Sequence, residues 1–246
     1  MNIRWEFRLG ALFLLISIAV YALKTYLLGS ESITDTVRYL FNAFGFLFIS
    51  VFMTSLVINE LLALRDKKER KEKTEIIMGT FFSEVGIPLL KTISRSDLDQ
   101  QTFHALFRQK IPWSEVTSQY NELLKNKTKL DISCLDLEAT MQYLHTKREF
   151  LLRLLENPVL LKHSEFTELL RALFHMSEEL DNRPCFCSLP ASDIAHLTGD
   201  IVRVYDQTKK MWISHMNYLY ENYPYLFSLA LRMNPFDPDV DPIVRE

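Results

Sequence analysis

Two histidine–carboxylate pairs are the residues of this chain whose types and spacing could bind a metal ion. His175 is followed four residues later by Glu179, and His196 is followed four residues later by Asp200. Residues at i and i+4 lie on the same side of an α-helix. The loop between the two segments is short, so an antiparallel pair of helices would bring both pairs to a similar height. Metal sites in helical bundles are built from such facing pairs.

The apolar periodicity argues against a metal site, because it places both pairs away from the core. In the first helix His175 lies opposite the apolar stripe, which consists of Phe166, Leu169, Leu170, Leu173, Ser177 and Leu180. In the second helix His196 and Asp200 lie opposite the predicted core side, which consists of Ile194, Leu197, Ile201, Tyr205 and Trp212. Ligands in bundle sites project inward. The four residues therefore remain candidates that the helical wheel disfavours.

No other pattern in the sequence indicates catalysis. GxSxG, HExxH and Walker motifs are all absent. The three cysteines, Cys134, Cys185 and Cys187, are too few and too unevenly spaced for a disulfide framework or a four-cysteine zinc site. The formal charge of −3 gives no preference for nucleic acid. The sequence favours a non-enzymatic protein, and we expect no cofactor and no nucleic-acid partner.

The elements that would position the two pairs are helices. The chain has only six glycines among 246 residues, and no alternating strand pattern is present. Apolar periodicity predicts helices at about 75–93, 97–109, 114–126, 134–156, 165–182, 190–222 and 225–233. Ser164, before Glu165, is the predicted N-cap of the fifth of these. We expect a compact helical bundle over residues 75–233.

Two uncharged runs precede this bundle. Leu9–Leu23 would cover about 22 Å as a helix, so a span there must extend past Lys24 to about residue 28. Leu40–Ile58 would cover about 28 Å and could extend to about residue 60. Together they predict a transmembrane hairpin over residues 1–64, with spans at about 9–28 and 40–60. The alternative for the first run is a cleaved signal peptide, because Arg4 and Arg8 precede it.

A run of nine charged residues follows the second span and predicts its orientation. Six of the nine are basic: Arg65, Lys67, Lys68, Arg70, Lys71 and Lys73. The connector Gly29–Tyr39 carries one basic and two acidic residues. An excess of basic residues marks the cytoplasmic side, so both termini are expected there, in a multi-pass protein of the plasma (inner) membrane. Residues 65–74 are predicted to form a basic juxtamembrane helix that contacts lipid headgroups.

The C-terminal region raises a separate question about where its aromatic residues pack. Met211–Met233 is rich in tryptophan, tyrosine and phenylalanine, and Tyr225–Leu231 is apolar nearly all round. Such a segment can pack in the core or return to the membrane interface, and the sequence leaves both open. Residues 234–246 contain three prolines, so we expect a Pro-rich acidic tail that is extended or disordered.

Five segments carry a resemblance to a known group of proteins: FFSEVGIPLL (81–90), LLRLLENPVLLKH (151–163), ALFHMSEELDNR (172–183), DIAHLTGDIVR (193–203) and ENYPYLFSLALRMNPFDP (221–238). They resemble a family of uncharacterised prokaryotic membrane proteins in which two N-terminal spans precede a helical cytoplasmic domain. The resemblance implies this architecture and no activity.

The sequence therefore predicts an all-α protein with an N-terminal two-helix transmembrane hairpin and a compact cytoplasmic helical bundle. The leading functional hypothesis is a membrane-anchored interaction or scaffold module, with the lipid bilayer and either a protein partner or a second copy of the chain as its partners. The alternative is a membrane-bound metal-dependent enzyme with a site at His175, Glu179, His196 and Asp200.

Overall fold

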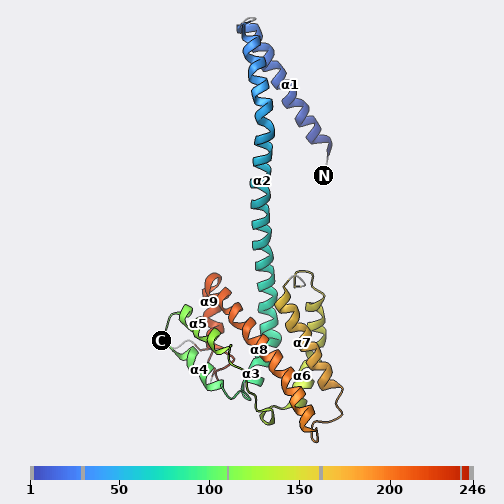
Figure 1. The fold of residues 1–246 in the computed structure, drawn as a ribbon, viewed down its shortest axis with the longest axis vertical. Coiled ribbons are helices and arrows are strands. Elements are labelled where there is room, and N and C mark those ends of the chain that lie inside the picture. Colours follow the sequence, from blue (N-terminus) through green and yellow to red (C-terminus); the bar gives the residue numbers. More distant parts are fainter. Residues whose placement is uncertain (1–2, 29–30, 110, 161–162, 239, 244–246) are drawn as a thin grey trace. The chain divides into compact units, whose positions relative to one another are not determined.

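The structure is a computed structural model that describes residues 3–28, 31–109, 111–160, 163–238 and 240–243, and every regular element in these ranges is a helix (Figure 1). Among these described residues, the one β-type pairing is an isolated antiparallel bridge between Asp97 and Leu130. The prediction of an all-helical protein is thus confirmed for the described residues. The side chains of Arg4 and Arg8, and residues Gly29 and Ser30 of the expected connector, lie outside them.

The chain divides into two compact units, Met1–Lys67 and Lys68–Glu246. The first contains α1 (Ile3–Leu28) and most of α2 (Glu31–Phe81). The two helices are joined by a hydrogen bond in which Lys24 Nζ donates to Thr36 Oγ1 over 3.0 Å. Because α2 begins at Glu31, most of the expected connector is helical. It contains no proline after Ser30 that would interrupt the helix.

By length and composition, one helix in the described part of the chain could cross a membrane. It is Ile33–Ser94, and none of its most apolar 18-residue window is buried. Leu12–Leu27 is apolar but shorter than such a span requires. The structure therefore supports one apolar span, where the sequence predicted two.

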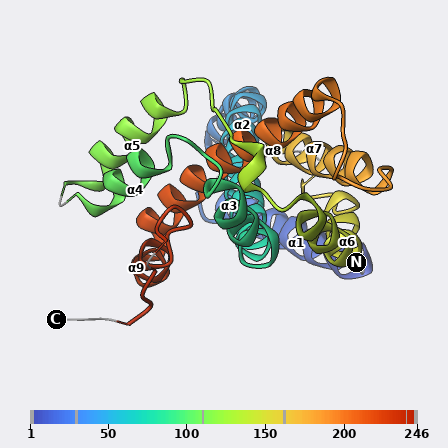
Figure 2. The same ribbon diagram turned by 90° about the horizontal axis from the view of Figure 1, so that it is seen from below.

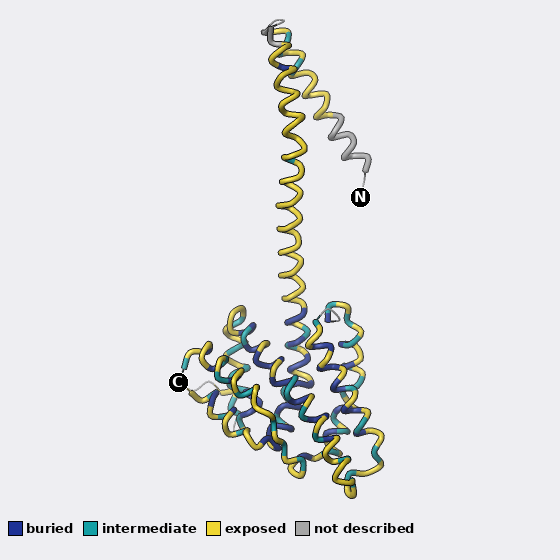
Figure 3. The backbone as a smooth tube through the Cα atoms, viewed as in Figure 1, coloured by how far each residue is buried: buried dark blue, intermediate teal, exposed yellow. Residues whose placement is uncertain are grey.

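Helix α2 does not end with the apolar run or with the cationic run. It continues to Phe81, passes into a π-helical turn at Phe82–Gly86 and then into α3 (Ile87–Ser94). The helix predicted at 75–93 is thus the final part of this longer element. Its residues from Val51 to Lys73 are exposed, and buried residues, among them Thr74, Glu75 and Met78, follow from Thr74 (Figure 3).

The remaining helices lie close to their predicted positions: α4 (Gln100–Arg108), α5 (Trp113–Leu123), a 3-10 turn (Ile132–Cys134), α6 (Leu137–Leu155), α7 (Ser164–Asp181), α8 (Ala191–Asn222) and α9 (Pro224–Arg232). Asp136 caps α6 by accepting a 2.8 Å hydrogen bond from the Ala139 amide. The N-cap of α7 is His163, whose Nδ1 accepts from the Phe166 amide over 3.2 Å. The prediction of Ser164 as that cap is wrong, because Ser164 is already helical.

Helix α8 is the centre of the second unit. It contacts α7 on one side and α3, α5 and α9 on others, and both views show α8 and α3 between the α4–α5 and α6–α7 pairs (Figures 1 and 2). Because it has neighbours on several sides, α8 buries more of its circumference than a surface helix would. Its buried residues include the polar Asp200, Thr208, Lys209 and His215.

The aromatic residues of α8 pack in the core, and part of the expected tail joins them. Trp212 is 1% exposed and Phe236 is not exposed at all. Their rings meet edge to face, with centroids 5.4 Å apart, and both also contact Phe107 and Tyr120. The prediction that residues 234–246 are extended or disordered is therefore wrong at Phe236. Pro235 and Pro238 prevent a helix here, but Phe236 between them is still buried in the core.

Candidate functional site

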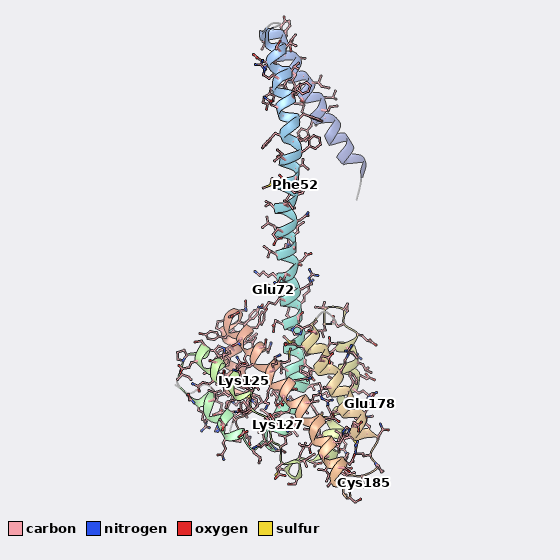
Figure 4. The ribbon with its side chains drawn as sticks, in the orientation of Figure 1. Phe52, Glu72, Lys125, Lys127, Glu178 and Cys185 are labelled. Carbon is pink, nitrogen blue, oxygen red and sulfur yellow. The ribbon has the colours of Figure 1, made fainter. Side chains whose placement is uncertain are left out.

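The His/carboxylate candidates come together on neighbouring faces of α7 and α8. His175 and Glu179 lie one turn apart on α7, and His196 and Asp200 lie one turn apart on α8. The Nε2 atoms of His175 and His196 lie 3.5 and 3.4 Å from Asp200 Oδ2. Glu178, labelled in Figure 4, marks this part of α7. The expected height match between the two pairs is thus present.

The helical wheel was wrong for Asp200, which it placed on the side of α8 opposite the core. Its side chain is only 4% exposed, whereas those of His175 and His196 are 45% and 53% exposed. The wheel assumed one buried stripe along α8, but α7 packs against that helix, and Nε2 of His175 on α7 lies 3.5 Å from Asp200 Oδ2. Ile194 was misplaced in the opposite sense, being 37% exposed although the wheel put it in the core.

The buried carboxylate of Asp200 is incompletely satisfied. Its Oδ1 lies 3.2 Å from Arg203 Nη1, but Oδ2 is buried and accepts no hydrogen bond. A buried carboxylate without full hydrogen bonding is costly unless a cation compensates it. The atom that lacks a hydrogen bond is the one that faces both imidazoles.

Arginines flank the cluster and hold its carboxylates. Arg183 Nη1 donates to Glu179 Oε2 over 2.9 Å, and Arg183 also pairs with Asp193 in two hydrogen bonds of 2.8 and 2.6 Å. The hydrogen bond from Arg183 lowers the pKa of the Glu179 carboxyl, and the same guanidinium lowers the pKa of Asp193. Glu179 is therefore a fixed anion beside the two histidines, 3.9 Å from His175 Nε2 and 3.6 Å from His196 Nε2.

This arrangement offers two imidazole nitrogens and one carboxylate oxygen that all lie within 4.8 Å of one another. Imidazole and carboxylate are the common ligands of zinc and other borderline divalent metals. The same geometry also suits two protonated histidines that share one carboxylate. In either case the cluster links α7 to α8.

The predicted membrane-contacting cations lie on one continuous stretch of α2, and all six are exposed: Arg65, Lys67, Lys68, Arg70, Lys71 and Lys73. Lys71 Nζ lies 5.7 Å from the centroid of the Tyr218 ring on α8. Burial raises the pKa of the Tyr218 hydroxyl to about 12, so this ring is neutral at physiological pH.

Next to Lys71 lies a groove that the sequence did not reveal. Its volume is about 710 Å³, and it is lined by the end of α2 together with α8 and α9. At its base Glu75 and His215 form a buried pair, with 3.1 Å between Oε2 and Nδ1. On its rim Leu226 and Leu229 of α9 are 43% and 45% exposed, and no residue of α9 is buried. Glu75 and His215 are 140 residues apart, so no local pattern could have paired them.

Comparison with known proteins identifies relatives along almost the whole chain. Residues 1–62 match the family described as "MJ1433, N-terminal helical domain", and residues 70–232 match "Uncharacterized protein MJ1433, C-terminal helical domain". A protein of Methanocaldococcus jannaschii, "Uncharacterized protein MJ1433", is 39% identical over 224 residues, which cover 90% of this chain and 89% of the relative. No solved structure matches the chain. The two family matches and this relative show that the chain belongs to the MJ1433 family of helical proteins.

Proposed function

We propose that this protein is a non-enzymatic, membrane-anchored interaction module of the plasma (inner) membrane. In this proposal the N-terminal hairpin is the anchor, both termini are cytoplasmic, and the helical bundle of the second unit presents a binding surface at the membrane. The partners are the bilayer itself and a protein or second copy of the chain held at the same surface.

The observation that carries the proposal is the order of surfaces along α2. Its large apolar side chains between Leu40 and Ile58 are 46–76% exposed, as at Phe52 (Figure 4). A soluble protein rarely exposes apolar side chains over so long a stretch, whereas a bilayer buries them. The exposed cations begin at Arg65, and buried residues follow them from Thr74. Apolar, basic and buried segments in this order favour a span that leaves the membrane on the cytoplasmic side.

Helix α9 supports a surface role for the bundle. Leu226 and Leu229 line the groove beside Lys71 and are partly exposed, and Tyr225, next to Leu226 in the chain, is 71% exposed. Aromatic and aliphatic side chains next to lysines are typical of segments that rest in the headgroup region. We therefore assign α9 to the membrane interface, where it frames the groove that would take a membrane-associated partner.

Topology is tested with single cysteines in the full chain, in a background where Cys134, Cys185 and Cys187 are serine. A membrane-impermeant maleimide should label Ser32→Cys in intact cells. The matched control retains only native Cys185, which is exposed in the second unit and should react only after the membrane is opened. Labelling of Cys185 in intact cells would refute the orientation. Changing all six cations of the basic run to glutamine should mix the two orientations.

Docking of α9 is tested by depth-dependent quenching in nanodiscs that contain anionic lipid. In the same background, Leu229→Cys carries an environment-sensitive fluorophore, and nitroxide lipids labelled at the headgroup should quench it. Leu152→Cys on α6 is the control, because Leu152 is also an exposed leucine, at 40%. Equal quenching at the two positions would show that α9 is not at the interface.

A further inference from the structure

We infer that His175, His196 and Asp200 form a zinc site that joins α7 to α8. The proposal does not depend on membrane anchoring, because all three residues belong to the second unit. It rests on the ligand set, on the spacing of the donor atoms and on the buried carboxylate oxygen that faces them.

The donor spacing corresponds to tetrahedral coordination. Zinc bonds of about 2.0–2.2 Å at tetrahedral angles place ligand atoms about 3.3–3.6 Å apart. The two separations from Asp200 Oδ2 to the histidine Nε2 atoms are 3.5 and 3.4 Å. An octahedral ion with bonds of about 2.1 Å would need neighbouring donors about 3.0 Å apart. Both distances also exceed those of good charge-assisted hydrogen bonds, about 2.7–2.9 Å.

The burial of Asp200 supplies the second, independent argument. Its residue is 3% exposed, and its Oδ2 is buried without a hydrogen bond. An ion held by Oδ2 would compensate this charge where no protein donor does. Its Oδ1 remains paired with Arg203, which orients the carboxylate as outer-shell partners orient metal ligands.

The ligand types select zinc over magnesium or calcium. Two imidazoles and one carboxylate suit a borderline ion, whereas magnesium and calcium require oxygen ligands. The half-exposed imidazoles can rotate to close the remaining distance between them. Three protein ligands leave a fourth position for water, and Glu179 flanks it, held in place by Arg183. The ion would thereby connect one residue of α7 with two of α8.

The experiment measures metal binding by the full chain in mild detergent, without a histidine tag and with all three cysteines changed to serine. The serine background removes thiolate ligands, since Cys134, Cys185 and Cys187 are all free and exposed. After chelator treatment and dialysis, titration with Zn²⁺ should show about one equivalent bound per chain. Titration with Co²⁺ should give the intense visible absorption of a tetrahedral complex, and Zn²⁺ should abolish it by displacement.

Four variants separate the site from adventitious binding. Asp200→Asn keeps the side-chain shape but removes the anionic ligand, and His175→Ala removes the ligand from α7. Each should weaken zinc binding by about 100-fold or more, because losing a ligand exceeds the 10–100-fold effect of an outer-shell change. Glu179→Gln should weaken zinc binding by about 10–100-fold, the effect of an outer-shell change. His145→Ala is the matched control, because His145 is an exposed histidine on α6, and it should change nothing.

Circular dichroism verifies that each variant is folded. Wild-type protein that binds no zinc would overturn the proposal, and so would binding that Asp200→Asn leaves intact. An octahedral cobalt spectrum would refute the tetrahedral geometry. Zinc should also raise the melting temperature of the wild type and of His145→Ala but not that of Asp200→Asn.

Discussion

Changing Gly86 to alanine should destabilise the second unit, although alanine is ordinarily the more favourable residue in a helix. Gly86 ends the π-helical turn and is buried. A Cβ there would lie 2.5 Å from Cδ1 and 3.0 Å from Cε1 of Phe82, and 3.1 Å from Cε1 of Phe81. The Phe82 ring cannot simply swing away, because it is 3% exposed and stacks on the His215 ring at 5.4 Å.

A second glycine in the same helical stretch isolates this steric effect. A Cβ at Gly79 would meet only the His215 ring, at 3.5 Å, which is ordinary van der Waals contact. Both substitutions gain the same helix propensity, about 1 kcal/mol. Overpacking typically costs about 1–3 kcal/mol, so Gly86→Ala should be less stable than Gly79→Ala by that amount. For a unit of this size the difference corresponds to about 2–12 °C in melting temperature.

The assay is thermal unfolding of the full chain in detergent, followed by tryptophan fluorescence for the wild type and both variants. Gly79→Ala should melt at or above the wild-type temperature, and Gly86→Ala should melt below Gly79→Ala. Equal melting temperatures for the two variants would refute the reasoning, because they would show that the side chains around Phe82 rearrange without loss of stability.

Three further predictions concern the same unit. Trp212→Ala should lower the free energy of unfolding by about 3–5 kcal/mol, whereas Tyr225→Ala, at a ring that is 71% exposed, should change it by less than about 0.5 kcal/mol in denaturant titrations. Phe236→Ala should lower the free energy of unfolding about as much as Trp212→Ala. An effect as small as that of Tyr225→Ala would show that Phe236 is not part of the core. Burial raises the pKa values of Tyr143 and Tyr218 to about 12, while the pKa of an unfolded tyrosine is about 10. Between these values the unfolded state loses protons that the folded state keeps, so stability measured by urea titration should fall as the pH rises from about 10 to about 12.

Local signals predicted the helices well. Apolar periodicity located α4 to α9 to within a few residues, and Pro158 and Pro224 mark helix boundaries as expected. The cap of α7 was misplaced by one residue because His163 is an unusual cap, accepting through a ring nitrogen.

The sequence failed where burial depends on more than one neighbour. A helical wheel assumes a single core direction, which holds for α7, whose predicted stripe from Phe166 to Leu180 is buried. It fails for α8, because contacts on several sides leave no single solvent face. Asp200 was therefore taken for a surface residue, and the site it shares with the two histidines was disfavoured. Phe236 was missed for a related reason, since its partners are distant in sequence and no periodicity connects them.

The position of Phe236 in the core has a consequence for biosynthesis. Its ring stacks on Phe103 and Phe107, which the ribosome makes long before it reaches residue 236. The aromatic centre of the second unit therefore cannot close while the chain between these residues is still being translated. By then the apolar segment of α2 has already emerged and is available for insertion into a membrane. In the membrane-anchored protein that we propose, insertion of this segment would come first, and the bundle would complete its folding while held at the membrane.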